Sequence, residues 1–348
     1  MPIPIGILSL ATASPPNELL QDEVAEVARR LYEPRFPQFD RMAPVFRTAG
    51  IRSRQSAMPL EWYLQPRNWP DRSAAYAEAA LALYIDAATA ALDQAGLKGA
   101  DIDVLLTVSS TGIATPSLEA RAMGAMGFRS DAARIPVFGL GCAGGVTGLA
   151  LAARLAAAEP GKTVLLVCVE LCTLSMSAET PSKADIVAAA LFGDGAAACV
   201  LRAKAQGFAQ VTGAAEHTWP DSLDIMGWRV DPDGLGVIFA QSIPPFVRRR
   251  LRPAMDLMLD AQGLRAGEID RFVCHPGGMK VIEALETSLQ LGQGALVEER
   301  EVLADHGNMS APTALFVLDR VRRKPLPRLG VLTAMGPGFT ASTVTLAA

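Results

Sequence analysis

Hydrophobic residues along the chain follow two alternating patterns. Stretches with hydrophobic residues at helical spacing, such as residues 73–94, alternate with short runs rich in β-branched residues, such as 102–108, 163–169 and 329–333. Helices that alternate with short buried strands are typical of an α/β fold. Residues 1–16 are apolar, contain two early prolines and lack a basic leader, so we expect a strand there rather than a secretory signal.

One long uncharged run, residues 135–153, is long enough to cross a membrane. Five glycines and Pro136 interrupt it. Because these residues break a continuous helix, the run predicts a short strand, a glycine-rich turn and the start of a helix. We therefore expect no membrane span.

The sequence also indicates an internal duplication. The segment GLKGADIDVLLTVSSTG from Gly96 resembles GLRAGEIDRFVCHPGG from Gly263, and the Gly-Leu and Ile-Asp pairs keep the same spacing in both. At a similar shift, GLGCAGGVTGLALAARL pairs with DHGNMSAPTALFVLDRV, and KTVLLVCVE pairs with RLGVLTAMG. We expect two βαβ-rich halves, an N-terminal one over 1–205 and a C-terminal one over 206–348.

Three polar residues occupy related positions in the two halves. Cys142 and Asn308 lie at nearly equivalent places, each in a turn of small residues between a strand and an apolar helix, and His275 follows a strand of the second half. Ligand sites of α/β folds lie at strand ends. We therefore predict that Cys142, His275 and Asn308 meet at the junction of the halves.

Composition and charge exclude several classes of function. The net charge is −4, the isoelectric point is near 5.5 and no long basic run occurs, which argues against a nucleic-acid-binding surface. Five cysteines without a repeating spacing predict neither a disulfide framework nor a zinc site. These features favour small-molecule chemistry in the cytoplasm.

Cys142 has the surroundings of a reactive cysteine. A cysteine that opens a helix has its thiolate favoured by the helix dipole, and a neighbouring imidazolium lowers the thiol pKa further. The glycines of GLGCAGG permit a sharp turn and leave backbone N–H groups free for an oxyanion. The alternative is a buried structural cysteine, which is the interpretation we give to the other four: Cys168, Cys172, Cys199 and Cys274.

His275 and Asn308 supply complementary chemistry. His275 is followed by Pro-Gly-Gly, which cannot continue a strand, so its ring is expected to project into a cavity and to accept the thiol proton. Asn308 offers a neutral amide donor that suits a thioester carbonyl or an enolate. A core histidine and a turn asparagine are the alternatives. His217 and His306 are expected to be structural.

The chain resembles the thiolase superfamily and most closely the type III polyketide synthases, the chalcone-synthase-like enzymes. The resemblance covers nearly the whole chain, and the order of its motifs makes it specific. It implies a thiolase-like fold in which the duplicated halves form a five-layered α-β-α-β-α core. The motifs are GLGCAGG around Cys142, ELC at 170–172, LFGDGAAA at 191–198, CHPGG at 274–278, GNMSAPT at 307–313 and MGPGF at 335–339.

The resemblance implies an iterative decarboxylative condensation. Cys142 would be acylated by an acyl-CoA starter, and His275 and Asn308 would hold the thioester oxygen of malonyl-CoA as it loses carbon dioxide. It implies a homodimer and no metal, flavin or nicotinamide. It also assigns substrate-binding residues: Phe192 and Phe239 as aromatic gates, Thr115 at the subunit-contact loop, Ser310 in GNMSAPT, and Gly336, Pro337 and Gly338 in the wall of the cyclisation pocket.

The finer resemblance is to bacterial alkylresorcinol and alkylpyrone synthases, and it rests on residues 179–197 and 305–313. It implies a long-chain fatty acyl-CoA starter, malonyl-CoA as extender and closure to an alkylresorcinol or alkylpyrone. Thr115 stands where chalcone synthases carry a methionine, and the smaller side chain would leave room for an alkyl tunnel. The family's CoA-binding lysines do not align, so Arg52 and Arg54 are the candidates for CoA phosphates, with solvated surface charge as the alternative.

Two other functions remain open at this point. A ketoacyl-carrier-protein synthase III would use the same Cys-His-Asn set for a single condensation. A non-catalytic, lipid-binding or scaffolding descendant of the fold would keep the architecture without the reaction. HPGG and GNMSAP favour the polyketide interpretation over the first, and the intact trio argues against the second. A degradative thiolase would need a second cysteine in the last glycine-rich loop, which MGPGF lacks.

Overall fold

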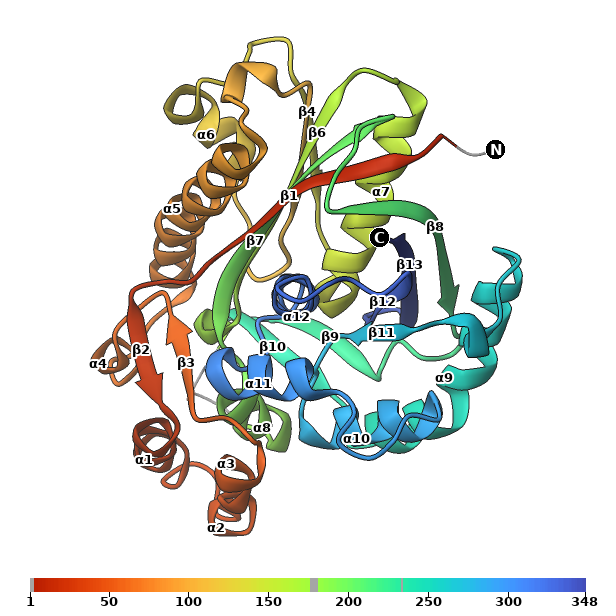
Figure 1. The fold of residues 1–348 in the computed structure, drawn as a ribbon. Helices are drawn as coiled ribbons and strands as arrows, with labels where there is room; N and C mark the ends of the chain where they lie inside the picture. The colour runs from red at the N-terminus through yellow and green to blue at the C-terminus, as the bar shows by residue number, and fades with distance from the viewer. Residues whose placement is uncertain (1–2, 176–180, 233) are drawn as a thin grey trace.

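A computed structural model describes residues 3–175, 181–232 and 234–348. The first two residues of the 179–197 stretch lie outside this range. The secondary structure alternates as the hydrophobic pattern predicts (Figure 1). The strands are β1 Ile5–Ala13, β2 Asn17–Leu20, β3 Ser53–Ser56, β4 Val104–Val108, β5 Ala133–Val137, β6 Thr163–Leu171, β7 Asp194–Ala203, β8 Ala209–Thr218, β9 Met226–Asp231, β10 Gly234–Phe239, β11 Arg271–Cys274, β12 Leu329–Gly336 and β13 Thr340–Ala347. The helices are α1 Gln21–Tyr32, α2 Phe39–Met42, α3 Pro44–Thr48, α4 Leu60–Tyr63, α5 Trp69–Ala95, α6 Leu118–Met126, α7 Gly144–Ala158, α8 Lys183–Leu191, α9 Ile243–Asp260, α10 Met279–Ser288, α11 Val297–His306 and α12 Thr313–Val321, with short 3₁₀ turns η1 Gly99–Asp101, η2 Gly141–Ala143, η3 Cys172–Ser175 and η4 Ala266–Glu268.

Local sequence signals set the ends of the long helix α5. Asn68 caps its first turn by accepting a hydrogen bond from the Asp71 backbone N–H, and Asp71 returns the contact to Asn68. Gly96 ends the helix in the left-handed conformation, which a glycine adopts without steric cost. The expected helix over 73–94 is therefore confirmed, with ends set by capping.

The duplication predicted from the sequence is present in the strand order. The nine-stranded sheet of the described residues runs β11-β12-β13-β8-β1-β7-β6-β4-β5. In one half β4 pairs parallel with β6, which pairs antiparallel with β7, and in the other β11, β12 and β13 repeat this pattern. The predicted boundary after residue 205 lies in the loop between β7 and β8, which pair with opposite edges of β1.

Five layers stack around a shared central pair of helices. Helices α7 and α12 lie between the two halves, and α7 contacts β4, β6 and β7 on one side and β12 and β13 on the other. Helix α5 covers the outer face of β1, β6 and β7, while α9 covers β8 and β13 and packs on α10. The expected α-β-α-β-α core is confirmed.

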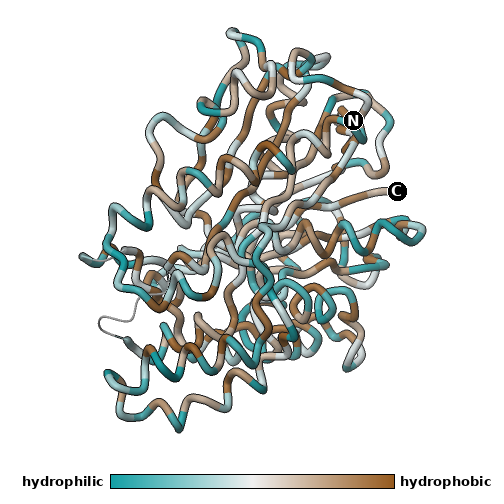
Figure 2. The backbone as a smooth tube through the Cα atoms, turned by 90° about the vertical axis from the view of Figure 1, so that its left-hand side faces the viewer, coloured by the Kyte–Doolittle hydropathy of each residue, from teal (hydrophilic) through white to brown (hydrophobic). Residues whose placement is uncertain are grey.

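Hydrophobic residues concentrate along the central strands and the inner helix faces, and hydrophilic residues follow the outer turns (Figure 2). Two helices, α5 and the one beginning at η2 and continuing through α7, are long and apolar enough to span a membrane by composition alone. Both are core elements here, because α7 fills the middle layer and α5 packs its apolar face on the sheet. The run at 135–153 divides into β5, a glycine turn and α7, as predicted.

Candidate active site

The turn that carries Cys142 is built by glycines that allow close packing. Gly141 adopts a left-handed conformation with φ of +48°. A Cβ atom added to Gly145 would lie 2.2 Å from the carbonyl oxygen of Ala311, in the loop that follows Asn308. No side chain other than hydrogen fits such a distance, so the glycines bring the cysteine turn and the asparagine loop into direct contact.

Cys142 and Asn308 meet across this contact. The Cys142 Sγ lies 3.9 Å from Asn308 Oδ1, and Ser310 donates its backbone N–H to the same oxygen at 2.8 Å. The backbone of Asn308 is held by Leu191 and Gly193 through hydrogen bonds of 2.8 and 3.0 Å. Asn308 is fully buried, so its amide is fixed rather than solvated.

His275 reaches the same region through its own loop. It follows the last residue of β11, and its backbone N–H donates to the carbonyl of Thr333 at 2.9 Å. Asn308 Nδ2 donates to the carbonyl of Gly277, two residues beyond His275, at 3.3 Å. The structure thus joins Cys142 to Asn308 directly and links the His275 loop to both through the asparagine amide.

Burial acts against the charged forms of both Cys142 and His275. Burial raises the pKa of the Cys142 thiol to about 11, although Ser310 and Asn308 act in the opposite direction. Burial also lowers the pKa of His275 to about 3. The sequence predicted a thiolate favoured by the helix dipole and an imidazolium. The loss of solvation opposes both of these effects, since charged forms are disfavoured away from water.

A cavity of about 380 Å³, its open side included, adjoins Cys142. Phe192, Phe239, Ser310 and Pro337, all predicted substrate-binding residues, contribute to its wall. Gly336 and Gly338 are not part of it. Gly336 instead packs behind the cysteine turn, where an added Cβ would lie 2.4 Å from the carbonyl oxygen of Leu140.

Several lining residues were not predicted. Cys172, which the sequence suggested was purely structural, lines the cavity together with Met226, Trp228, Val237 and Ile238. The hairpin β9–β10 that supplies the last four carries no catalytic motif, so apart from Phe239 no signal in the sequence singled out its residues. Trp228 packs edge-on against Phe192, with ring centroids 6.1 Å apart.

Glu170, the first residue of the ELC motif, is a buried polar residue near Cys142 to which the sequence assigned no role. It is fully buried and accepts hydrogen bonds from the Ser110 backbone and the Thr111 hydroxyl at 2.9 and 2.7 Å. Its Oε1 has no hydrogen-bond partner among the described residues. Burial raises the pKa of Glu170 to about 8. Ser110 in turn accepts from the backbone N–H groups of Gly139 and Gly141, beside Cys142.

A second, larger cavity encloses about 1310 Å³, its open side included. Phe239 lines both cavities. Three basic residues, Arg41, Lys183 and Lys280, line the larger one, beside Gly277 of the His275 loop. They are far apart in the sequence, which is why no local pattern revealed them.

The two arginines predicted for CoA phosphates have different surroundings. Arg54 is only 1% exposed, and its guanidinium donates to the carbonyls of Ala189, Ala190 and Phe192. Its assignment to CoA is therefore wrong, because no ligand reaches it. The side chain of Arg52 is 70% exposed and forms an ion pair with Asp305.

The remaining predicted residues lie away from the Cys142 cavity. Thr115 is exposed, in a loop whose neighbours Ile113 and Ala114 line a separate cavity. His306 packs on Phe316, its Nδ1 lies 2.7 Å from Gln55 Oε1, and His217 packs on Trp219, which agrees with structural roles. Among the described residues no group of three or more His, Cys, Asp or Glu is arranged to hold a metal ion.

Comparison with known proteins identifies the family. Residues 64–205 match the N-terminal domain of chalcone and stilbene synthases, and residues 210–348 match the C-terminal domain. The chain is 40% identical to 1,3,6,8-tetrahydroxynaphthalene synthase of Streptomyces peucetius subsp. caesius, over 98% of this chain and 92% of that protein. It is 28% identical to the alpha-pyrone synthesis polyketide synthase-like Pks18 of Mycobacterium tuberculosis (strain CDC 1551 / Oshkosh), over 96% and 88%.

The fold agrees with a solved structure in the same family. The crystal structure of 1,3,6,8-tetrahydroxynaphthalene synthase from Streptomyces coelicolor A3(2), a bacterial type III polyketide synthase, superposes with a TM-score of 0.93 at 28% identity and covers 98% of this chain and 99% of that one. Sequence, fold and site together place this chain in the chalcone and stilbene synthase family, as a type III polyketide synthase, an acyltransferase that condenses malonyl-CoA iteratively.

Proposed function

We propose that this type III polyketide synthase loads an alkyl acyl-CoA starter on Cys142, extends it with malonyl-CoA and releases an alkylresorcinol or alkylpyrone. The observation that carries the proposal is the pair of cavities that meet at Phe239. The larger is lined in part by cations and suits a phosphorylated carrier group. The smaller holds the nucleophile and, among the described residues that line it, none is charged.

The trio would act in two steps. In the first, Cys142 Sγ attacks the starter thioester, its proton passes to His275, and CoA leaves as the thiol. Because burial raises the pKa of the Cys142 thiol and lowers the pKa of His275, the proton transfer would accompany the attack instead of preceding it. Deprotonation of a thiol with a pKa near 11 becomes favourable only as the sulfur forms its bond to carbon.

In the second step malonyl-CoA loses carbon dioxide and leaves an enolate. An amide has two N–H donors, and Asn308 uses one on Gly277, so the other is free for the enolate oxygen. Once CoA has left as the thiol, the His275 ring is neutral again, and its remaining N–H would be the second donor. The enolate carbon then attacks the acyl group on Cys142, and the thiolate departs ready for the next transfer.

Arg41, Lys183 and Lys280 are the proposed contacts of the CoA phosphates. All three line the larger cavity, and among the described residues no ion pair joins them to a carboxylate. Basic side chains that are not paired with a carboxylate attract phosphate groups. Arg52, already paired with Asp305, would contribute at most at the rim.

The apolar wall around Cys142 favours an alkyl starter. Met226, Trp228, Val237 and Ile238 surround the space, and each buried methylene of a starter adds about 0.8 kcal/mol to binding. A malonyl starter would place a carboxylate against these residues without a cation to meet it. The second candidate is nevertheless a naphthalene-type product from malonyl units alone, because the relative of 40% identity carries that activity in its name and the cavity is small.

A ladder of acyl-CoA starters with malonyl-CoA, analysed by mass spectrometry, separates these outcomes. The proposal predicts that kcat/KM rises with starter length and that products carry one alkyl chain. Tetrahydroxynaphthalene from malonyl-CoA alone would overturn the alkyl starter and support the second candidate. A single condensation would indicate a ketoacyl synthase III-like reaction.

Trapping of an acyl group on Cys142 tests whether the chain is a catalyst at all. We expect a mass increase equal to the acyl group after incubation with the starter, and its loss in Cys142→Ala. Absence of the adduct and of any product in the wild-type chain would favour a lipid-binding scaffold.

A homodimer is proposed for the face that carries β5. This strand is at the end of the sheet with several exposed positions, and Ile113 and Phe138 beside it are 59% and 56% exposed. An unpaired edge with large exposed apolar side chains is typical of an interface. A second copy would cover both, and Thr115, in the same loop, would then face the partner's cavity.

Light scattering at several concentrations tests the dimer. The wild-type chain is expected at twice its mass of 36.7 kDa, and Phe138→Arg at the monomer mass. A monomeric wild-type chain would overturn the proposal. With its substrates being CoA thioesters, we propose an intracellular location.

A further inference from the structure

The position of the His275 ring is not set by hydrogen bonds from side chains. Neither ring nitrogen has a hydrogen-bond partner among the described residues, and the residue is only 5% exposed. A ring without a partner takes its orientation from the backbone that carries it and from packing. The end of β11 is therefore the element that places this imidazole.

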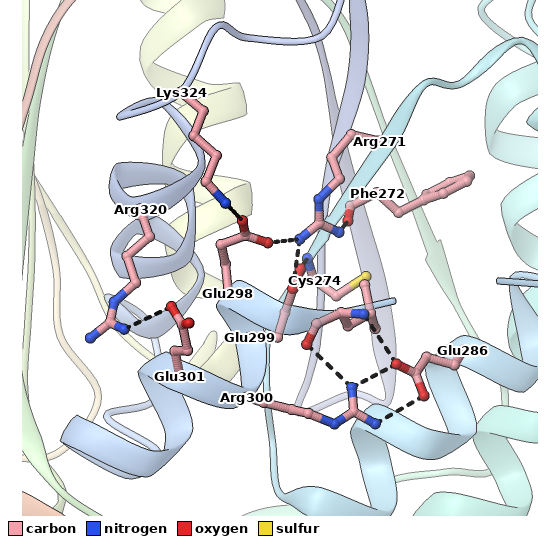
Figure 3. A network of polar contacts seen from close by, with 11 residues as sticks. Arg271, Phe272, Cys274, Glu286, Glu298, Glu299, Arg300, Glu301, Arg320 and Lys324 are labelled. Carbon is pink, nitrogen blue, oxygen red and sulfur yellow. Dashed lines mark hydrogen bonds and ion pairs between the residues drawn. The ribbon is translucent and has the colours of Figure 1, made fainter. Parts of the chain in front are cut away.

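That end lies on the open edge of the sheet. Strand β11 is at the end of the nine-stranded sheet and, among the described residues, pairs with no strand besides β12. On the paired side the His275 N–H donates to Thr333. On the open side the N–H of Cys274 would have no strand to bind, and instead it donates to Glu299 Oε1 at 2.9 Å (Figure 3).

Glu299 comes from α11 and is fully buried. Its other oxygen, Oε2, accepts from Arg271 Nη2 at 2.7 Å, at the start of the same strand. Arg271 also contacts Glu298, which pairs with Lys324 at 2.9 Å. One carboxylate thus holds both ends of β11, and a small ionic network holds the carboxylate.

The helix that supplies Glu299 also leads to Asn308. Helix α11 ends at His306, and Gly307 and Asn308 follow it directly. The hydrogen bond from Cys274 to Glu299 therefore fixes the strand that delivers His275 against the helix that delivers Asn308. A displacement of either element changes the distance between the two groups that are proposed to share the enolate oxygen.

We infer that Glu299 is a positioning residue for condensation, one that sets the spacing of His275 and Asn308 without touching the substrate. The inference rests on the proposed roles of those two residues. Because the spacing of His275 and Asn308 affects the transition state, removal of the Glu299 carboxylate should lower kcat and leave the KM for malonyl-CoA unchanged.

The chain offers a matched control at Glu286. This carboxylate is also buried, pairs with Arg300 at 2.6 and 2.9 Å, and accepts a backbone N–H, that of Leu296, at 3.1 Å. It lies in the same region (Figure 3), and among the described residues no hydrogen bond or ion pair joins it to β11. Loss of Glu286 therefore removes an equivalent set of bonds without loosening the strand that carries His275.

The experiment compares Glu299→Ala, Glu299→Gln and Glu286→Ala by urea unfolding and by steady-state kinetics. We expect Glu299→Ala to lower kcat about ten- to a hundredfold, with the KM for malonyl-CoA within about twofold of wild type. Glu299→Gln keeps an acceptor for the Cys274 N–H and should recover most of kcat. Glu286→Ala should lose similar stability and retain kcat.

Equal losses of kcat in Glu299→Ala and Glu286→Ala, or no recovery in Glu299→Gln, would overturn the inference and leave Glu299 a purely structural residue. The rate of Cys142 alkylation by iodoacetamide separates failure of the inference about Glu299 from failure of the proposed function. Alkylation requires the cysteine and its base but no condensation. A wild-type chain that does not condense would refute the proposed function, while slower alkylation in Glu299→Ala alone would still support positioning of His275.

Discussion

Gly336→Ala tests how tightly strand β12 supports the Cys142 turn. Gly336 ends β12, and an added Cβ would lie 2.4 Å from the carbonyl oxygen of Leu140 and 2.7 Å from Ala143. Non-bonded heavy atoms pack at about 3.5–4.0 Å, so the turn must move by roughly 1 Å. Overpacking of this kind costs about 1–3 kcal/mol of folding free energy.

The catalytic effect should exceed the effect on stability. A misplacement of about 1 Å at a reacting group costs on the order of a hundredfold in rate, so we expect kcat to fall by about that factor. The KM for malonyl-CoA should change little, because Gly336 does not line the larger cavity. Steady-state kinetics and urea unfolding measure the two effects on the same preparation.

Gly124→Ala is the matched control. Gly124 lies within α6, and no heavy atom stands within 4 Å of an added Cβ. Replacement of a helical glycine by alanine stabilises by roughly 0.5–1 kcal/mol, so this variant should be fully active. If Gly336→Ala kept kcat within about twofold of wild type, the turn would be adaptable and the reasoning from close packing would be refuted.

Three further predictions follow from buried or shared side chains. Arg54→Leu leaves three backbone carbonyls without their donor and should lower the free energy of unfolding by about 3 kcal/mol. Arg52→Leu should cost less than about 1 kcal/mol in the same urea titration, because its ion pair is exposed. Equal costs for the two variants would contradict the buried role of Arg54. The pKa of His275 in the folded chain, about 3, is below its ordinary value of 6.5. Between pH 3 and pH 6.5 the unfolded chain therefore binds more protons than the folded chain, and the free energy of unfolding falls as the pH drops below about 6.5. The loss from this residue is about 2 kcal/mol at pH 5, and unfolding of His275→Gln at pH 7 and pH 5 should show a correspondingly smaller loss. Phe239→Ala joins the two cavities and should raise kcat/KM for long starters relative to short ones; an unchanged ratio would show that Phe239 does not limit access.

The sequence by itself determined the repeating architecture and singled out the candidate reactive groups. Alternating hydrophobic patterns gave the α/β class, because buried strands and amphipathic helices impose their own periods. The paired segments from Gly96 and Gly263 predicted the duplication, and each begins with a short 3₁₀ turn followed by β4 or β11. Cys142, His275 and Asn308 were recognisable because glycine-rich turns at strand ends are local signals.

Tertiary structure alone decided how those groups are held and what surrounds them. Arg54 appeared available for a phosphate, but burial directs it to backbone carbonyls, and no local pattern encodes that. Arg41, Lys183 and Lys280 converge on one cavity from three distant segments. The raised pKa of the Cys142 thiol follows from desolvation, which depends on all the atoms packed around the sulfur. Motifs report the chemistry of a residue and its neighbours in the chain, whereas solvation and convergence arise only when distant segments fold together.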